Sequence, residues 1–119
     1  LALREIKANS AVEALIKSIL KPGNEKNRGT MVYALQELDC RAQLVGIFKV
    51  FMYGNYECKS HASSILNNQE FEFNEEDLQL ISDLWQDCKT HPDKCTCYED
   101  AKDHIQSDID AFGDILNEN

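Results

Sequence analysis

Apolar residues recur every three or four positions along most of the chain, and this spacing restricts the fold more than any other feature of the sequence. A repeat near 3.6 residues places apolar side chains on one face of an α-helix. The one alternating segment, QEFEF at 69–73, has no second segment to pair with in a sheet, so we expect an extended connector. The pattern predicts an all-α fold. A length of 119 residues suits one domain, a single compact bundle of five or six helices spanning 1–119.

The first predicted helix covers residues 11–20. Ser10 followed three positions later by Glu13 fits a capping box, in which each side chain satisfies a backbone N–H at the helix start. The sequence Lys-Pro-Gly at 21–23 should end the helix, because proline disfavours the α conformation in the residue before it.

The middle of the chain predicts one long helical stretch and a shorter one. From Glu25 to Tyr53 the apolar spacing keeps its helical period, with a bend expected near Asp39, and Gly54 is a natural stop. A shorter helix is expected over residues 57–66.

Two helices are predicted in the last third of the chain. Asn74 should cap the first, because its side chain can accept a backbone N–H and three acidic residues follow in the first turn. Pro92 should end this helix, and Asp93 or Thr96 should start the last one.

Charge is divided unevenly along the chain. Residues 1–68 hold nine Lys or Arg against six acids, or +3, whereas residues 69–119 hold three against fifteen, or −12. The basic excess is small and scattered, which argues against nucleic-acid binding. No apolar run reaches the roughly 20 residues that a membrane-spanning helix needs. We therefore expect neither nucleic acid nor membrane as a partner.

Five cysteines in so short a chain are typical of secreted proteins, in which disulfides supplement a limited core. The sequence begins LALREIKANS, without Met or an apolar signal core, so we expect a mature chain or a fragment of a longer one. The predicted localisation is extracellular.

The cysteines are predicted to form disulfides that staple the helices together. Cys95 and Cys97, two positions apart at a helix entry, should reach different partners rather than each other. A Cys58–Cys97 bond would contribute roughly 4 kcal/mol and a Cys88–Cys95 bond roughly 2.5 kcal/mol on loop-entropy grounds. The connectivity stays open, with Cys40 as the candidate for the unpaired thiol.

Other chemistry at these residues fits the sequence less well. Structural zinc sites favour cysteine pairs with two to four intervening residues, and the spacing of His91, Cys95 and Cys97 is a weak match. The segment DIDAFGD at 108–114 fails the EF-hand pattern at two ligand positions. Nothing in the spacing brings a histidine to a cysteine for nucleophilic catalysis. We predict no catalytic residue, metal site or cofactor, and no enzyme activity.

Three stretches resemble a known family. LQELDC at 35–40, YGNYECKSHASSIL at 53–66 and the C-x6-C-x-C spacing from Cys88 to Cys97 are similar to the C-terminal domain of the mosquito salivary aegyptin and anopheline antiplatelet proteins. The resemblance covers roughly residues 35–100. In that family a low-complexity region rich in Gly and acidic residues precedes the cysteine-bearing domain, and this sequence does not contain one. The resemblance therefore implies that residues 1–119 are the C-terminal fragment of a longer secreted chain.

The resemblance implies a secreted salivary protein that binds collagen without catalysis, so that no covalent bond is made or broken. By covering the sites used by platelet collagen receptors and by von Willebrand factor, such a protein would block platelet adhesion and aggregation. It assigns no binding residue to this chain.

Collagen chemistry suggests where such a site could lie. The exposed imino-acid rings of a triple helix suit shallow aromatic surfaces rimmed by charge. The candidates are Tyr53, Tyr56 and Lys59, which flank a turn, and Phe71 and Phe73 on the polar connector. The two phenylalanines could instead plug the helical core.

Two alternatives belong to other functional classes. A helical small-ligand carrier resembling odorant-binding proteins would need an enclosed pocket, and the C-x3-C spacing of that class is missing. A non-catalytic scaffold domain is the other alternative. The sequence predicts no oligomeric state.

Overall fold

The computed structural model describes residues 2–117, with side chains for 9–24 and 26–117. This part of the chain contains helices and no strand, which confirms the all-α prediction. There are six α-helices and two short 3-10 helices: α1 (Ala2–Leu20), η1 (Glu25–Asn27), α2 (Arg28–Gln36), α3 (Leu44–Tyr53), α4 (Tyr56–Asn68), α5 (Glu75–Thr90), η2 (Pro92–Lys94) and α6 (Tyr98–Asn117).

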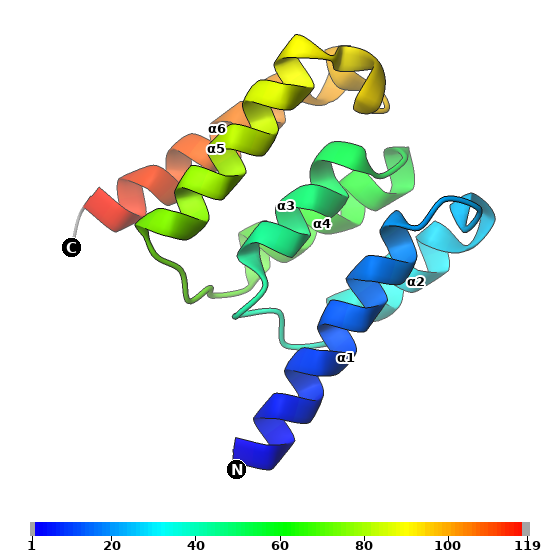
Figure 1. Cartoon of the computed structure of the whole chain (residues 1–119), viewed down its shortest axis with the longest axis vertical. Helices are drawn as coiled ribbons and strands as arrows, with labels where there is room; N and C mark the ends of the chain where they lie inside the picture. The colour runs from blue at the N-terminus through cyan, green and yellow to red at the C-terminus, as the bar shows by residue number, and fades with distance from the viewer. Residues whose placement is uncertain (1, 118–119) are drawn as a thin grey trace.

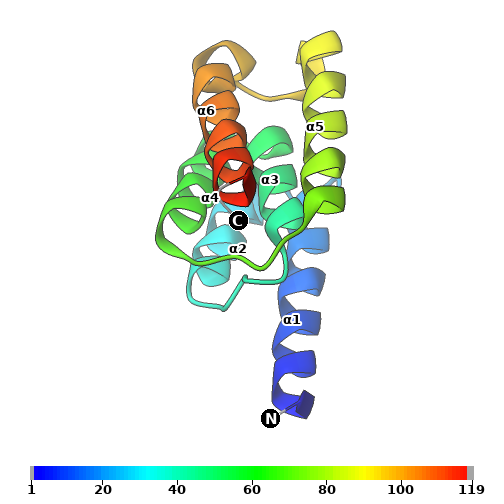
Figure 2. The same cartoon turned by 90° about the vertical axis from the view of Figure 1, so that its left-hand side faces the viewer.

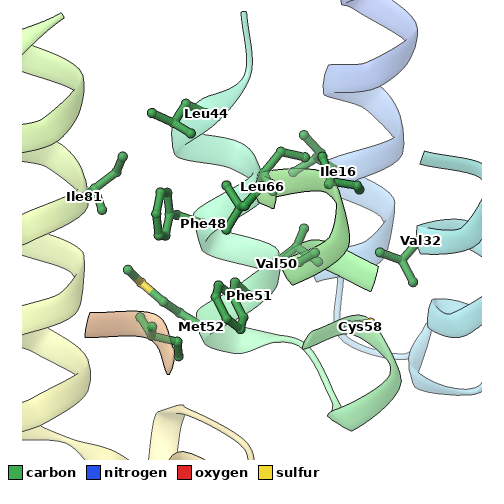
Figure 3. Packing of buried hydrophobic residues seen from close by; sticks show 14 of the residues in the cluster. Ile16, Val32, Leu44, Phe48, Val50, Phe51, Met52, Cys58, Leu66 and Ile81 are labelled. Carbon is green, nitrogen blue, oxygen red and sulfur yellow. The ribbon is translucent and has the colours of Figure 1, made fainter. Parts of the chain in front are cut away.

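The helices form two layers. Helices α1, α3 and α5 lie side by side in one layer, and α2, α4 and α6 lie behind them in the other (Figures 1 and 2). Helix α3 is central and contacts α1, α4, α5 and α6. Its sequence, LVGIFKVFMY, is apolar on nearly every side, as a helix surrounded by others must be. Figure 3 shows Phe48, Phe51 and Met52 of α3 within the core.

Helix α1 begins earlier than predicted. It starts at Ala2, so Ser10 and Glu13 lie inside the helix and the predicted capping box is wrong. The segment ALREIK at 2–7 is made almost entirely of good helix formers, which lets the helix extend upstream. The predicted end is confirmed, because α1 stops at Leu20.

The long helix predicted from Glu25 to Tyr53 is divided by a loop at 37–43. The expected bend is therefore a complete break, made by side chains that take over the backbone hydrogen bonds. Asp39 accepts the N–H of Arg41 (3.1 Å). Gln69 accepts the N–H of Cys40 at 2.9 Å and donates to the carbonyl of Leu38 at 3.0 Å.

The next three predictions are confirmed, with small shifts in boundaries. Helix α4 covers Tyr56–Asn68, residues 70–74 form an extended connector, and Asn74 caps α5 in a full capping box with Asp77. The entry to the last helix differs from the prediction: Pro92 opens η2, and α6 starts at Tyr98.

All five cysteines carry free thiols in this structure, Cys97 exposed and the other four buried. The predicted disulfide staples are therefore not among the contacts that hold the bundle together here. None of the helices in the described part of the chain combines the length and apolarity that a membrane crossing needs.

Candidate functional site

Lys59 does not lie on the surface. Only 5% of it is exposed, and its Nζ donates to the backbone carbonyls of Phe51 (2.7 Å) and Met52 (2.8 Å). A third contact runs 3.6 Å to the Sγ of Cys95. Burial lowers the pKa of the ammonium. The predicted role of Lys59 as a surface charge beside collagen is wrong for this conformation, because the two carbonyls and the sulfur surround the charge.

The two tyrosines that flank the turn at 54–55 point to different environments. Tyr53 is half-buried, and its burial, with a smaller effect of the neighbouring Cys88, raises the pKa of this tyrosine. Tyr56, the first residue of α4, is 73% exposed. Of the two, only Tyr56 is available to a partner.

Phe71 and Phe73 lie against the core. Both are partly buried, and their rings meet the edge or face of Phe112 of α6 at centroid distances of 5.8 and 5.4 Å. The interpretation that they plug the core therefore agrees with the structure. Each keeps some exposed surface at the connector.

Cys40 is remote from the other cysteine contacts. Its buried Sγ lies 3.6 Å from the carbonyls of Leu35 and Leu38. Burial, with a smaller effect of the Asp39 carboxylate, raises the pKa of this thiol from 9.0 to about 11. A protonated, enclosed thiol of this kind is a poor nucleophile.

Titration of Cys40 should weaken the fold at alkaline pH. The pKa of Cys40 is higher in the folded chain than in the unfolded chain. The stability that the neutral thiol contributes is therefore fully present below pH 9.0 and is lost as pH rises through about 11. Two pKa units correspond to about 2–3 kcal/mol. In urea unfolding, the stability difference between the parent chain and Cys40→Ala should shrink by about 2 kcal/mol between pH 8 and 11. A pH-independent difference would contradict the buried neutral thiol.

A surface formed by α2 and α4 gathers exposed aromatic and small polar side chains. The two helices run parallel, since Gly29 lies beside Glu57, Tyr33 contacts His61, and Gln36 Nε2 donates to Ser64 Oγ at 3.1 Å. We call this surface the tyrosine face and define it by Thr30, Tyr33, Tyr56, Ser60, His61, Ser63, Ser64 and Asn67.

The aromatic members of the tyrosine face are held differently. The Tyr33 ring, 60% exposed, stands at 89° to the His61 ring with 5.8 Å between centroids. His61 Nδ1 is hydrogen-bonded to Gln36 Oε1, which orients the imidazole. Tyr56 begins a stripe that continues through Ser60 and on along α4, at the spacing of one helix face. None of the eight side chains is a carboxylate or an ammonium.

Sequence reasoning selected Tyr56 and missed Tyr33 and His61. Tyr33 stands next to Met31 and Val32 but lies off the apolar stripe, and a tyrosine outside the buried face of a helix was the available signal. His61 could not be selected, because its partner Tyr33 lies 28 positions away in the chain and only packing of α2 on α4 brings the rings together.

The hollows on the surface differ from a carrier's pocket. One groove of about 420 Å³ lies where the connector passes the 37–43 loop; it is open, and charged side chains make up much of its lining. Its residues are Glu37, Leu38, Asp39, Arg41, Gln69, Glu70, Phe71 and Glu72. A small apolar ligand favours an enclosed, mostly apolar site.

Within the described residues, no group of three or more His, Cys, Asp and Glu side chains could hold a metal ion. No protein-family model matches the chain, and neither the curated proteins nor the solved structures gave a match.

Proposed function

We propose that this chain is a secreted, non-catalytic salivary domain that binds collagen through the tyrosine face. By occupying the triple helix it would block platelet receptors and von Willebrand factor, and so prevent platelet adhesion and aggregation. The proposal includes disulfides among Cys58, Cys88, Cys95 and Cys97 as the covalent support of the bundle. The resemblance at 35–100 supports collagen as the partner. The exposed aromatic rings of the tyrosine face are the observation that supports a binding site there.

The composition of the tyrosine face suits a neutral, extended partner. Tyr33 and Tyr56 offer rigid rings with a polar tip, at a small cost in conformational entropy. Ser60, Ser63 and Asn67 add short hydrogen-bonding groups around them. Surfaces rich in Tyr, Ser and Asn recur in protein-binding loops for these reasons. None of the eight residues carries a carboxylate or an ammonium, so a partner that covers them loses charge solvation mainly where it reaches the exposed Glu57 carboxylate beside Gly29.

A collagen triple helix presents matching chemistry. Its polyproline-II chains expose imino-acid rings and solvated backbone carbonyls along a stiff rod. Tyrosine rings can pack on the imino-acid rings, while hydroxyl and amide groups donate to the carbonyls. The strongly acidic helices α5 and α6 lie on the far side of α3 from α2 (Figure 1), so most of the negative charge is remote from the part of this surface that α2 contributes.

Replacing both Tyr33 and Tyr56 with alanine should weaken binding to immobilised fibrillar collagen at least tenfold, a change of about 1.4 kcal/mol. Truncation removes two exposed rings and leaves the core intact, so helix content by circular dichroism should not change. The pair Tyr33→Phe with Tyr56→Phe keeps the rings and should retain most of the affinity. The Leu80→Ala variant, at an exposed apolar position of α5, is the control and should bind like the parent.

Reduced and alkylated chain serves as a second control, because it tests whether the covalent support matters for binding. If the parent chain shows no saturable binding to collagen, the proposed function is wrong. If it binds and the double alanine variant binds equally well, collagen is the partner and the tyrosine face is not the site.

A further inference from the structure

The end of α5 and the 3-10 helix η2 form a tight corner. The chain leaves α5 at Thr90 and turns back, so that Lys94 Nζ lies 3.2 Å from a carboxylate oxygen of Asp87. His91 Nδ1 lies 3.3 Å from the same carboxylate, and the Cys95 N–H donates to the Pro92 carbonyl at 3.1 Å. Residues 87 and 94 are thus brought together on the outside of the corner.

The residues that follow each of these two, Cys88 and Cys95, are both buried, with exposures of 0% and 3%. The thiol of Cys95 lies 3.6 Å from the buried Lys59 ammonium at the start of α4. The thiol of Cys88 is close enough to Tyr53, at the end of α3, for the two groups to act on each other's pKa. Burial raises the pKa of Cys88, and Cys95 and Lys59 are among the groups that act on it. Both sulfurs therefore face the same region, between the end of α3 and the start of α4.

We propose that Cys88 and Cys95 form a disulfide across this corner, above the Lys59 ammonium. This inference names one pair within the disulfide support of the proposed function. Two of the other thiols fit less well. Cys40 is enclosed at the 37–43 loop, and Cys97 is exposed with a backbone φ of 57°.

The bond forms by thiol–disulfide exchange with a small-molecule disulfide such as oxidised glutathione. The thiolate of Cys95 attacks one sulfur of the oxidant, breaks its S–S bond and releases one thiolate. Cys88 loses its proton to solvent and attacks the Cys95 sulfur of this mixed disulfide, which releases the second thiolate. Two electrons pass from the two protein sulfurs to the oxidant, and the two protons lost from the cysteines convert its halves to thiols. Because both positions are buried in the final fold, the exchange takes place before the corner closes.

The bond would fasten the corner that joins α5 to α6. In the thiol form, Lys59 contacts this corner through a single 3.6 Å interaction with Cys95. A covalent link between Cys88 and Cys95 holds the corner in the shape that presents Cys95 to the ammonium, independently of the exposed Asp87–Lys94 ion pair. Exposed ion pairs contribute little by themselves.

Peptide mapping tests the pairing. The chain is refolded with reduced and oxidised glutathione, blocked with N-ethylmaleimide and digested with trypsin without reduction. Cleavage after lysine and arginine places Cys40, Cys58 and Cys88 in separate peptides, 29–41, 50–59 and 60–89, and places Cys95 and Cys97 together in 95–102. The expected product is 60–89 joined to 95–102, and it should persist in Cys97→Ser and disappear in Cys95→Ser.

Three results would overturn the pairing. One is full alkylation of Cys88 after oxidative refolding, and another is a link from 60–89 to 50–59 or to 29–41. The third is loss of the link in Cys97→Ser with retention in Cys95→Ser, which would assign the partner of Cys88 to Cys97. The readout is a mass and does not depend on collagen, so a failed binding assay and a failed pairing are separate outcomes.

Discussion

Replacing Phe112 with alanine should lower the free energy of unfolding by about 3–5 kcal/mol. Phe112 is 8% exposed and joins three parts of the molecule. Its ring makes edge-type contacts with Phe48 of α3 at 5.8 Å, and with Phe71 and Phe73 of the connector. Removing the ring deletes these contacts and leaves a cavity that the close-packed side chains around it cannot refill.

Chemical denaturation followed by tryptophan fluorescence measures this loss, since Trp85 is the one tryptophan in the chain. The control is Leu80→Ala, an apolar truncation at a position that is 53% exposed, which should change stability by less than about 1 kcal/mol. Equal effects of the two substitutions would show that Phe112 does not anchor α6. Phe71→Ala and Phe73→Ala should each cost less than Phe112→Ala, because each removes only one contact with that ring.

Replacing Lys59 with alanine should cost about 2–4 kcal/mol of folding free energy, through lost hydrogen bonds and an unfilled space. The ammonium donates to Phe51 and Met52 carbonyls in the last turn of α3, where helix carbonyls have no partner within the helix. A positive charge there also interacts favourably with the helix dipole. Lys59 therefore caps α3 from the first turn of α4.

The Lys59→Met variant separates the two causes. Methionine fills most of the same space but cannot donate a hydrogen bond. Lys59→Met should therefore lower the free energy of unfolding, but by less than the alanine substitution does. The pH dependence supplies a second readout. Burial lowers the pKa of Lys59, so the unfolded chain holds the proton more tightly than the folded one. The stability advantage of the parent over Lys59→Met should thus grow as pH rises toward 10.5. A variant as stable as the parent at every pH would exclude the capping role.

Local patterns in the sequence were enough to predict most helices of this protein. The capped start of α5 at Asn74, the helix α4 and the connector between them follow from neighbouring residues alone. Capping and periodicity act within one or two turns, so a single sequence carries this information in full. The start of α1 was misplaced because Ser10 and Glu13 also tolerate an exposed helix interior.

Contacts between distant residues decided the rest. The break at 37–43 depends on Gln69, which lies about 30 positions further along the chain and supplies the hydrogen bonds that the helix gives up. The sequence alone indicates a surface position for Lys59. In the folded chain, α3 and the corner that holds Cys95 enclose its ammonium.

The candidate binding surface shows the same division. The sequence by itself predicted a helix over 57–66 and gave Tyr56, at the turn before it, as a candidate binding residue. Only the tertiary structure placed Tyr33 of α2 against His61 and so made one surface from two helices. The physical reason is range: the hydrogen bonds within a helix join residues four apart, whereas packing of one helix on another joins residues of any separation.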